Sequence, residues 1–281
     1  MRKLSVKAYG KLNLTLDCLD KRPDGYHNLK SIMHPISLYD LVTLEKTEKN
    51  DIEVDCDFVS KTDNLVFKAA NAFFESSGIT DRGIKITVEK QIPLLSGLGG
   101  GSSDAAAVIN MLDSLYGTGF SDAKKIRLAN SLGADVPFAL FNKSAVAEGT
   151  GEKLSFIEDF PRLFFVLIKP CHKESTGEMY KKLDILGQSG KKYTDNTLLA
   201  LESGDIKSAV KSFGNDFTVC QDQKYFNDIF LLARKYGALT TSLTGSGPTY
   251  FSVFEKETDS TNFFNSVCQS FLFVSLAKSV G

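Results

Sequence analysis

The 281-residue chain has no excess of charge of either sign, because 33 Lys and Arg residues oppose 34 Asp and Glu residues. This balance gives no indication of nucleic-acid or anionic-membrane binding. The longest apolar runs, 163–168 and 271–277, are far shorter than the ~20 residues that span a bilayer. Residues 1–16 alternate polar and apolar positions without a continuous apolar core. We therefore expect no signal peptide, and a cytoplasmic protein.

Closely spaced cysteine pairs are also missing. The five cysteines are odd in number, widely scattered and never in a CxxC arrangement: Cys18, Cys56, Cys171, Cys220 and Cys268. This pattern predicts reduced thiols in a reducing compartment and argues against a structural zinc site.

The composition, 42% hydrophobic and 24% charged, is close to that of an average globular protein. It excludes a disordered chain, a collagen and a coiled-coil rod. The length suits one large domain or two ordinary ones. Helical and strand patterns alternate without a long linker, which predicts an α+β protein with two halves that meet near residues 155–160.

Residue periodicity predicts the elements that carry the motifs. Residues 12–16 alternate as a strand, with Lys11, Asn13 and Thr15 on its other face. Pro23-Asp24-Gly25 predicts a turn inside a loop at 20–28. Asp63 and Ser121 are expected helix N-caps. The remaining expected strands are 84–88, 163–168, 249–254 and 272–276, and the remaining helices are 105–115, 176–183, 196–201 and 226–236.

The most informative segment is the glycine-rich stretch 93–104, PLLSGLGGGSSD, which leads into a predicted helix. Three consecutive glycines lose much backbone entropy on folding, which is tolerated best where a ligand approaches the backbone closely. The N–H groups at a helix N-terminus bind anions, most often phosphate. Ser102 and Ser103 add hydroxyls for phosphate oxygens or Mg²⁺. The alternative is a flexible turn.

Two common phosphate motifs do not fit this stretch, since neither G-x-x-x-x-G-K-[ST] nor G-x-G-x-x-G occurs there. The spacing P-x-x-x-G-L-G-x-x-S-S instead resembles the second motif of the GHMP kinases, a family that includes galactokinase, homoserine kinase, mevalonate kinase and phosphomevalonate kinase. The run GLGGGSSDAA is most similar to the branch that phosphorylates 4-diphosphocytidyl-2-C-methyl-D-erythritol.

The resemblance implies an ATP site on this loop, with Mg²⁺ bound through ATP and Ser103 as the candidate protein ligand. Asn64 matches a residue near the adenine pocket of the family. Leu95 departs from the branch, which usually has a small residue there, and we expect it to change packing more than chemistry. We also expect Gly100→Val to block phosphate binding. The implied ATP-binding residues are Asn64, Leu95, Ser96, Gly97, Leu98, Gly99, Gly100, Gly101, Ser102, Ser103 and Asp104.

Two residues are implied to carry the chemistry. Lys11, in Lys11-Leu12-Asn13-Leu14, matches the first family motif, and Asn13 is implied to contact substrate. Asp135, in Leu132-Gly133-Ala134-Asp135, matches the stretch that supplies the catalytic aspartate. Without the resemblance, Lys11 would be a solvated strand residue and Asp135 an Asp in a polar turn.

Three further segments match the family. Tyr26 and His27 match the cytidine-recognition loop, where a ring can stack on the base and an imidazole can read its edge. Thr176 and Tyr180 match substrate-contacting positions, with Tyr180 where Phe is common. The run 243–249 resembles the third motif, a glycine-rich loop expected between a helix and a strand, with Gly245, Ser246 and Gly247 at its centre.

Taken together, the motifs imply a two-domain GHMP kinase fold. Residues 1–157 would form a domain like ribosomal protein S5 domain 2, and residues 158–281 a ferredoxin-like domain. The implied function is transfer of phosphate from ATP to the 2-hydroxyl of the cytidyl substrate in non-mevalonate isoprenoid biosynthesis. The alternatives are a GHMP kinase for another alcohol, such as homoserine, and a non-catalytic metabolite-binding relative. We expect a small-molecule substrate, a monomer or homodimer, and neither nucleic-acid nor membrane partners.

Overall fold

The computed structural model describes residues 3–56, 64–187 and 190–280. The chain forms two compact units that are interleaved in sequence. Unit 1 comprises Met1–Gly10, Tyr39–Leu94 and Gly99–Asn142, and unit 2 comprises Lys11–Leu38, Leu95–Leu98 and Lys143–Gly281. The domain boundary expected at 157/158 stays a prediction. Among the described residues, no helix is long and apolar enough to cross a bilayer.

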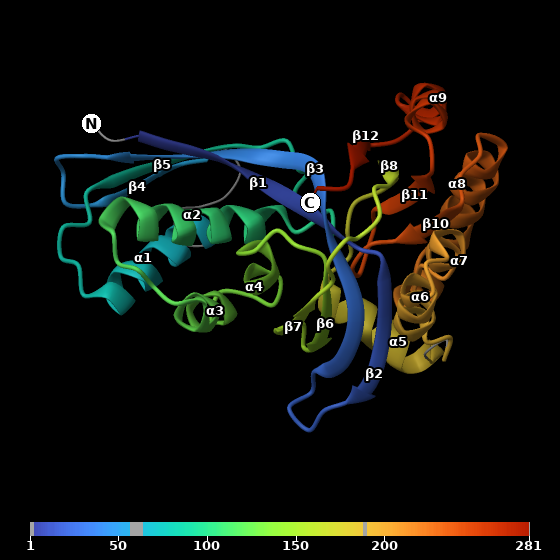
Figure 1. Ribbon diagram of the computed structural model, residues 1–281, viewed down its shortest axis with the longest axis horizontal. Helices are drawn as coiled ribbons and strands as arrows, with labels where there is room; N and C mark the ends of the chain where they lie inside the picture. Colours follow the sequence, from blue (N-terminus) through green and yellow to red (C-terminus); the bar gives the residue numbers. More distant parts are fainter. Residues whose placement is uncertain (1–2, 57–63, 188–189, 281) are drawn as a thin grey trace. The chain divides into compact units, whose positions relative to one another are not determined.

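Unit 1 is a sheet covered on one face by helices. Strand β5 lies between β4, which is parallel to it, and the antiparallel second half of β3, whose other neighbour is β1. Helices α1 and α2 cover one face of this sheet (Figure 1). Alternating positions of β5 are buried against them, as the strand pattern predicted. The elements are β1 (Lys3–Asn13), β3 (His27–Lys46), β4 (Ile52–Asp55), α1 (Leu65–Ser77), β5 (Ile84–Glu89), α2 (Gly100–Tyr116), α3 (Asp122–Asn130) and α4 (Val136–Ala139).

The helices of unit 1 begin where capping chemistry places them. Asn64 is the N-cap of α1, and its Oδ1 accepts a hydrogen bond from Val66 N at 2.9 Å. Asp63, the N-cap expected from the sequence, lies outside the described residues. Ser121 caps α3 as predicted. On α2, the expected inward face is buried from Ala105 to Leu112, at spacings of three and four residues.

Unit 2 contains two sheets. In the first, the initial half of β3 pairs with β2 and β6, β6 pairs with β7, and β2 pairs with β9. The second is antiparallel, in the order β10-β11-β8-β12. The strands are β2 (Thr15–Lys21), β6 (Ala145–Gly149), β7 (Lys153–Phe156), β8 (Phe164–Lys169), β9 (Gly214–Asn215), β10 (Thr240–Leu243), β11 (Tyr250–Phe254) and β12 (Phe273–Lys278).

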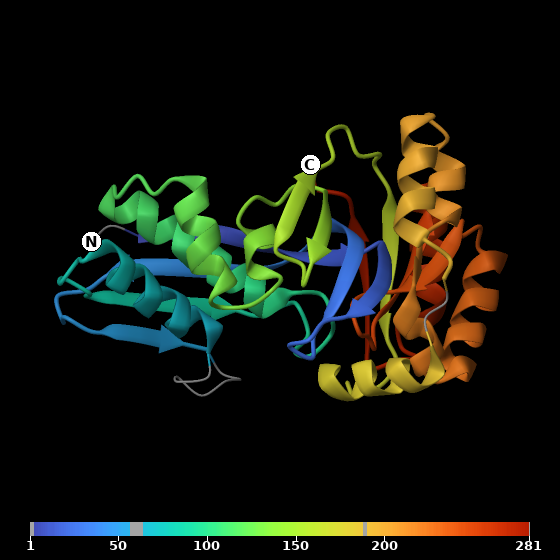
Figure 2. The same cartoon turned by 90° about the horizontal axis from the view of Figure 1, so that it is seen from below.

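Helices α8 and α9 pack on the second sheet and share one apolar core with it (Figure 2). Tyr250, Phe254 and Phe263 are fully buried in this core. The predicted α+β class is thus confirmed. The helices of unit 2 are α5 (Thr176–Leu186), α6 (Tyr193–Glu202), α7 (Ile206–Lys211), the 3₁₀ helix η1 (Asp216–Cys220), α8 (Gln223–Lys235) and α9 (Glu257–Val267).

Leu95 occupies a backbone conformation that favours glycine. Its φ is +51°, and its side chain is 72% exposed. A left-handed conformation costs a branched residue roughly 1–2 kcal/mol, whereas glycine adopts it freely but has more entropy to lose on folding. We expect Leu95→Gly to stabilise the protein by about 0.5–1 kcal/mol, measured by urea unfolding. Leu94→Gly is the matched control and should destabilise it. Equal losses of stability in both variants would show that the left-handed conformation of Leu95 does not cost the protein stability.

Candidate active site

The glycine-rich stretch ends in the uncapped start of a helix. Gly99 precedes α2 with a φ of +74°, and it has no side chain with which to cap the helix. Ser103 N donates to Gly99 O at 2.9 Å, which closes the first turn. The backbone N–H groups that precede Ser103 in this turn therefore donate no hydrogen bond to a side chain of the N-cap residue, Gly99. This arrangement suits an anion at the N-terminus of α2.

Within unit 2, the middle of the same stretch lies against the third glycine motif. Gly97 has a φ of +80°, and a Cβ built there would lie 2.8 Å from Thr244 O. Only glycine permits this approach of two backbones. Leu98 O accepts a hydrogen bond from Lys11 N at 2.9 Å, and Ser96 is 3% exposed. The first, second and third motifs therefore meet in unit 2 through main-chain contacts.

Lys11 and Asn13 point the same way from β1, as their spacing predicted. Lys11 Nζ donates to Asn13 Oδ1, and Asn13 Nδ2 donates to Ser31 Oγ at 2.8 Å. Both side chains are buried, with 4% of Lys11 and 5% of Asn13 exposed. A Cβ on Gly245 would lie only 3.7 Å from Lys11 Nζ. The ammonium of Lys11 is thus held beside the third glycine motif and is not a solvated surface charge.

The third motif connects two strands, so the expectation of a helix before it is wrong. Strand β10 precedes the loop and β11 follows it, with Leu243 paired to Tyr250. Strand β10 was not predicted, because its four residues are too few to show a clear alternation. Gly245 and Gly247 have φ values of +57° and +85°. Ser246 Oγ lies 3.1 Å from Thr176 Oγ1, so the structure brings the third motif to the start of α5.

An exposed ring and a buried ring lie next to each other where the loop before β3 meets the strand. Tyr26 is 68% exposed, and its N–H donates to Asp24 Oδ1 at 3.1 Å. His27 is buried and stacks on Tyr180 with ring centroids 5.0 Å apart and planes 16° from parallel. His27 Nε2 lies 2.7 Å from Asp184 Oδ1. Unit 2 therefore groups three of the predicted substrate residues, and it adds Asp184, which lies in no recognised motif.

Unit 1 carries the remaining predicted residues. Asp135 is half-buried and precedes α4, but within the described part of the chain its side chain does not cap that helix. Asn64 is 7% exposed, and its Oδ1 is used to cap α1. Ser103 is 4% exposed and donates through Oγ to Tyr9 O at 2.6 Å. That bond uses the Ser103 hydroxyl hydrogen, so its oxygen lone pairs suit a cation.

Gly100 faces protein and not open space. A Cβ there would lie 2.9 Å from Ile92 Cγ2 and 3.2 Å from Asp40 Oδ2, and its φ is not positive. The expectation that Gly100→Val acts by filling phosphate space is therefore wrong, because the added atoms would first displace Ile92. Gly101 is exposed, and of the residues that the structure describes a Cβ there would meet only Leu65 Cδ1, at 3.6 Å.

Beneath the start of α2 lies a buried group of three charges. Lys90 Nζ donates to Asp40 Oδ2 at 2.5 Å and to Asp104 Oδ2 at 2.8 Å. Asp40 also accepts from Gln91 N and Ile92 N. Asp104 Oδ1 has no hydrogen-bond partner among the described residues. Asp104, expected from the sequence to bind ATP, thus directs its side chain toward Lys90.

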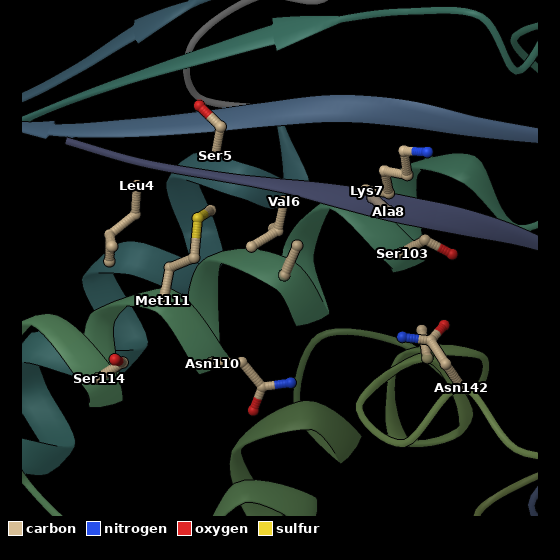
Figure 3. Close-up of a pocket in the computed structure, with 12 residues that line it drawn as sticks. Leu4, Ser5, Val6, Lys7, Ala8, Ser103, Asn110, Met111, Ser114 and Asn142 are labelled. Carbon is tan, nitrogen blue, oxygen red and sulfur yellow. The ribbon is translucent and has the colours of Figure 1, made fainter.

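A separate cavity of about 320 Å³ lies within unit 1, between β1 and α2 (Figure 3). Leu4, Val6 and Met111 line its apolar part, and Asn110 and Asn142 supply amides. Among the described residues that line it, Ser103 is the one predicted site residue. Asn110 Nδ2 already donates to Leu140 O at 3.1 Å. This cavity is therefore not where the predicted ATP-binding residues gather.

Two segments of the chain match domains of a known protein family. The GHMP kinases N terminal domain matches residues 64–143, and the GHMP kinases C terminal domain matches residues 224–272. A curated relative from Caldanaerobacter subterraneus subsp. tengcongensis is 39% identical over 284 residues, covering 99% of this chain and 97% of the relative. Another, from Caldicellulosiruptor saccharolyticus, is 37% identical over 259 residues, covering 90% and 89%. Both are named 4-diphosphocytidyl-2-C-methyl-D-erythritol kinase.

Solved structures agree with these matches. A crystal structure described as 4-(cytidine 5'-diphospho)-2C-methyl-D-erythritol kinase has a TM-score of 0.84 and 26% identity, covering 99% of this chain and 100% of that one. Homoserine kinase from Cytophaga hutchinsonii has a TM-score of 0.75 at 18% identity, covering 100% and 95%. The second likeness shows the fold alone. The GHMP kinase fold predicted from the motifs is confirmed.

Proposed function

The chain belongs to the GHMP kinase family, and on that premise we propose that it transfers the γ-phosphoryl group of ATP to the 2-hydroxyl of 4-diphosphocytidyl-2-C-methyl-D-erythritol. The products would be the 2-phosphate and ADP, in the non-mevalonate route to isoprenoids. The observation that carries the proposal is the near full-length similarity to relatives named for this activity, at 37% and 39% identity.

The glycine-rich stretch suits the phosphates of ATP. The N–H groups and positive dipole end of α2 favour an anion, and Gly99 adds no side chain that would obstruct it. Ser103 Oγ would serve as a ligand for Mg²⁺, which neutralises charge on the phosphates when bound. Asp104 supports ATP binding indirectly, because its buried carboxylate holds Lys90 at the start of α2.

Two side chains would carry the proton and charge chemistry. Asp135 takes or orients the proton of the substrate hydroxyl, since a half-buried carboxylate suits a general base. Lys11 stabilises the charge that develops on the attacking oxygen. Asn13 holds the Lys11 ammonium through a side-chain hydrogen bond, so its position is fixed before the substrate binds.

The loop before β3 would hold the cytosine. Tyr26 is exposed and offers a ring face, and stacking on such a ring is worth about 1–3 kcal/mol per base. We expect Tyr26→Ala to raise KM for the cytidyl substrate by about 5- to 150-fold, at ~1.4 kcal/mol per tenfold. Tyr26→Phe keeps the ring and should be mild, and KM for ATP should not change. If Tyr26→Ala instead raises only KM for ATP, the loop belongs to the nucleotide pocket.

A coupled ADP-release assay tests the proposed activity. We expect turnover with the cytidyl substrate and little with homoserine or mevalonate. The similarity to homoserine kinase is one of fold alone, at 18% identity, so it does not favour that activity. Turnover of homoserine in preference to the cytidyl compound would overturn the proposal. Absence of turnover with any alcohol would favour a non-catalytic relative.

The cysteines bear on the cellular location of the protein. Its cysteines carry free thiols, which supports the proposed cytoplasmic location, where thiols stay reduced. The substrate would be a small molecule. The expected monomer or homodimer stays a prediction.

A further inference from the structure

In unit 2, the carboxylate of Asp184 holds the buried imidazole of His27, which matches the cytidine-recognition loop of the family. Asp184 lies on α5, and its Oδ1 is 2.7 Å from His27 Nε2. Its other oxygen, Oδ2, accepts a hydrogen bond from Lys21 Nζ at 2.5 Å. Only 5% of the His27 side chain is exposed, against 33% of Asp184. Asp184 is therefore fixed from two sides, and it fixes the ring in turn.

The same helix fixes the plane of the ring. Tyr180 stacks on His27 with a centroid separation of 5.0 Å. Tyr180 in turn meets the buried ring of Phe217 edge-on, at 4.9 Å and 88°. Tyr180 and Asp184 are four residues apart on α5, so they share one face of the helix. The imidazole is thus held by a ring on its face and a carboxylate at its edge.

This arrangement selects one tautomer of the imidazole. A carboxylate only accepts hydrogen bonds, so His27 Nε2 must carry the hydrogen that lies toward Asp184. Hydrogen bonds from Lys21 and then His27 hold the pKa of Asp184 below its usual value, which keeps it ionised at neutral pH. In a neutral imidazole the second nitrogen, Nδ1, is then an acceptor. The described residues supply no hydrogen-bond partner to His27 Nδ1.

We propose that Asp184 is a positioning residue that makes His27 a hydrogen-bond acceptor and thereby selects cytosine over uracil. Cytosine carries an amino group where uracil carries a carbonyl oxygen. An accepting Nδ1 pairs with the amino group and repels the carbonyl. The inference rests on the proposed function only in assigning His27 to the base, since the tautomer follows from the contacts of Asp184.

Asp184→Asn is the informative variant. Lys21 donates and needs an acceptor, so the Asn oxygen turns to Lys21 and the Asn amide group then faces His27 Nε2. Nε2 must accept, the hydrogen moves to Nδ1, and the ring then favours a carbonyl. We expect the ratio of the UMP to the CMP dissociation constant to fall by about 5- to 150-fold, the range for ~1–3 kcal/mol of base discrimination. Asp184→Leu leaves the tautomer free and should give an intermediate ratio.

The tautomer is measured directly by ¹⁵N NMR of the His27 ring in the protein without nucleotide. We expect the Nε2–H form in the wild type and in Lys21→Met, and the Nδ1–H form in Asp184→Asn. Asp195→Asn is the matched control, because Asp195 pairs with Lys30 at 2.7 Å and, in the part of the chain that the structure describes, with no histidine. It should change neither the tautomer nor the nucleotide ratio. Thermal unfolding verifies that each variant is folded.

The outcomes separate this inference from the proposed function. A wild-type Nδ1–H ring overturns the inference, and so does a folded Asp184→Asn variant with an unchanged nucleotide ratio, even if the kinase is active. CMP preference that disappears in Asp184→Asn supports the inference, even if the ADP-release assay shows no turnover. In that case it is the proposed activity that fails.

Discussion

Asp135→Asn is expected to lower kcat by about 10²- to 10⁴-fold, the usual contribution of a general base. An amide keeps the shape of the carboxylate but cannot take the proton of the substrate hydroxyl. The fold should be retained, because the amide has nearly the same size and shape as the carboxylate it replaces. KM for ATP and for the cytidyl substrate should stay within a few-fold of the wild-type values. The measurement is steady-state ADP release, with unfolding curves as a check.

Asp122→Asn is the matched control for this prediction. Asp122 is an exposed carboxylate in the first turn of α3, in the same unit as Asp135, and it should be replaceable without loss of kcat. A kcat near the wild-type value in Asp135→Asn would remove Asp135 from the proton transfer. The carboxylate would then have to serve binding, which a raised KM would reveal.

The double variant Asp135→Asn with Lys11→Met asks whether the two residues serve one step. Residues that act as a unit lose activity non-additively, so the double variant should be little worse than the poorer single one. Independent roles would multiply the two losses. Lys11→Met also releases Asn13, whose Oδ1 accepts from the ammonium, so the variant must be verified as folded.

The sequence predicted the local features of the site well. The spacing of Lys11 and Asn13 on one strand gave their shared direction, which the hydrogen bond between them confirms. The glycine-rich stretch and its following helix were also predicted, since both depend on neighbours in the chain. The requirement for glycine at position 97 could not be predicted from its neighbours in the chain. It comes from the close approach of Thr244 O, a residue almost 150 positions away.

The features that the sequence missed depend on contacts between distant segments. Strand β3 has 20 residues but no clear alternation, because long stretches of it are buried on both faces. Asp184 carries no motif, and only the fold brings it to His27, 157 positions earlier. The ion group of Lys90, Asp40 and Asp104 joins three segments in the same way. The periodicity of the sequence does not reveal such contacts, because tertiary packing decides which distant residues meet.

That ion group also sets a pH dependence of stability. Burial raises the pKa of Asp104 from 3.8 to about 7, although Lys90 opposes the shift. The folded protein therefore holds a proton more tightly than the unfolded chain does. The stability that Asp104 contributes by keeping its proton in the folded protein is fully present below about pH 4 and is lost as the pH rises through about 7. Asp104→Asn should flatten the dependence over this range, as measured by urea unfolding at a series of pH values.

At a pH well above 7, where Asp104 is ionised, Lys90→Met is expected to destabilise the protein by about 3–5 kcal/mol, the usual effect of removing one partner from a buried ion pair. The side chains of Lys90, Asp40 and Asp104 are 8%, 0% and 4% exposed, so solvent cannot replace the lost ammonium. Adding Asp104→Asn should recover part of the loss, because it removes one of the two stranded carboxylates. Lys46→Met is the control: its pair with Asp81 is exposed, so its loss should change the stability far less than the loss of Lys90. Similar losses in Lys90→Met and Lys46→Met, or no recovery in the double variant, would show that Lys90 does not hold the two carboxylates at the start of α2.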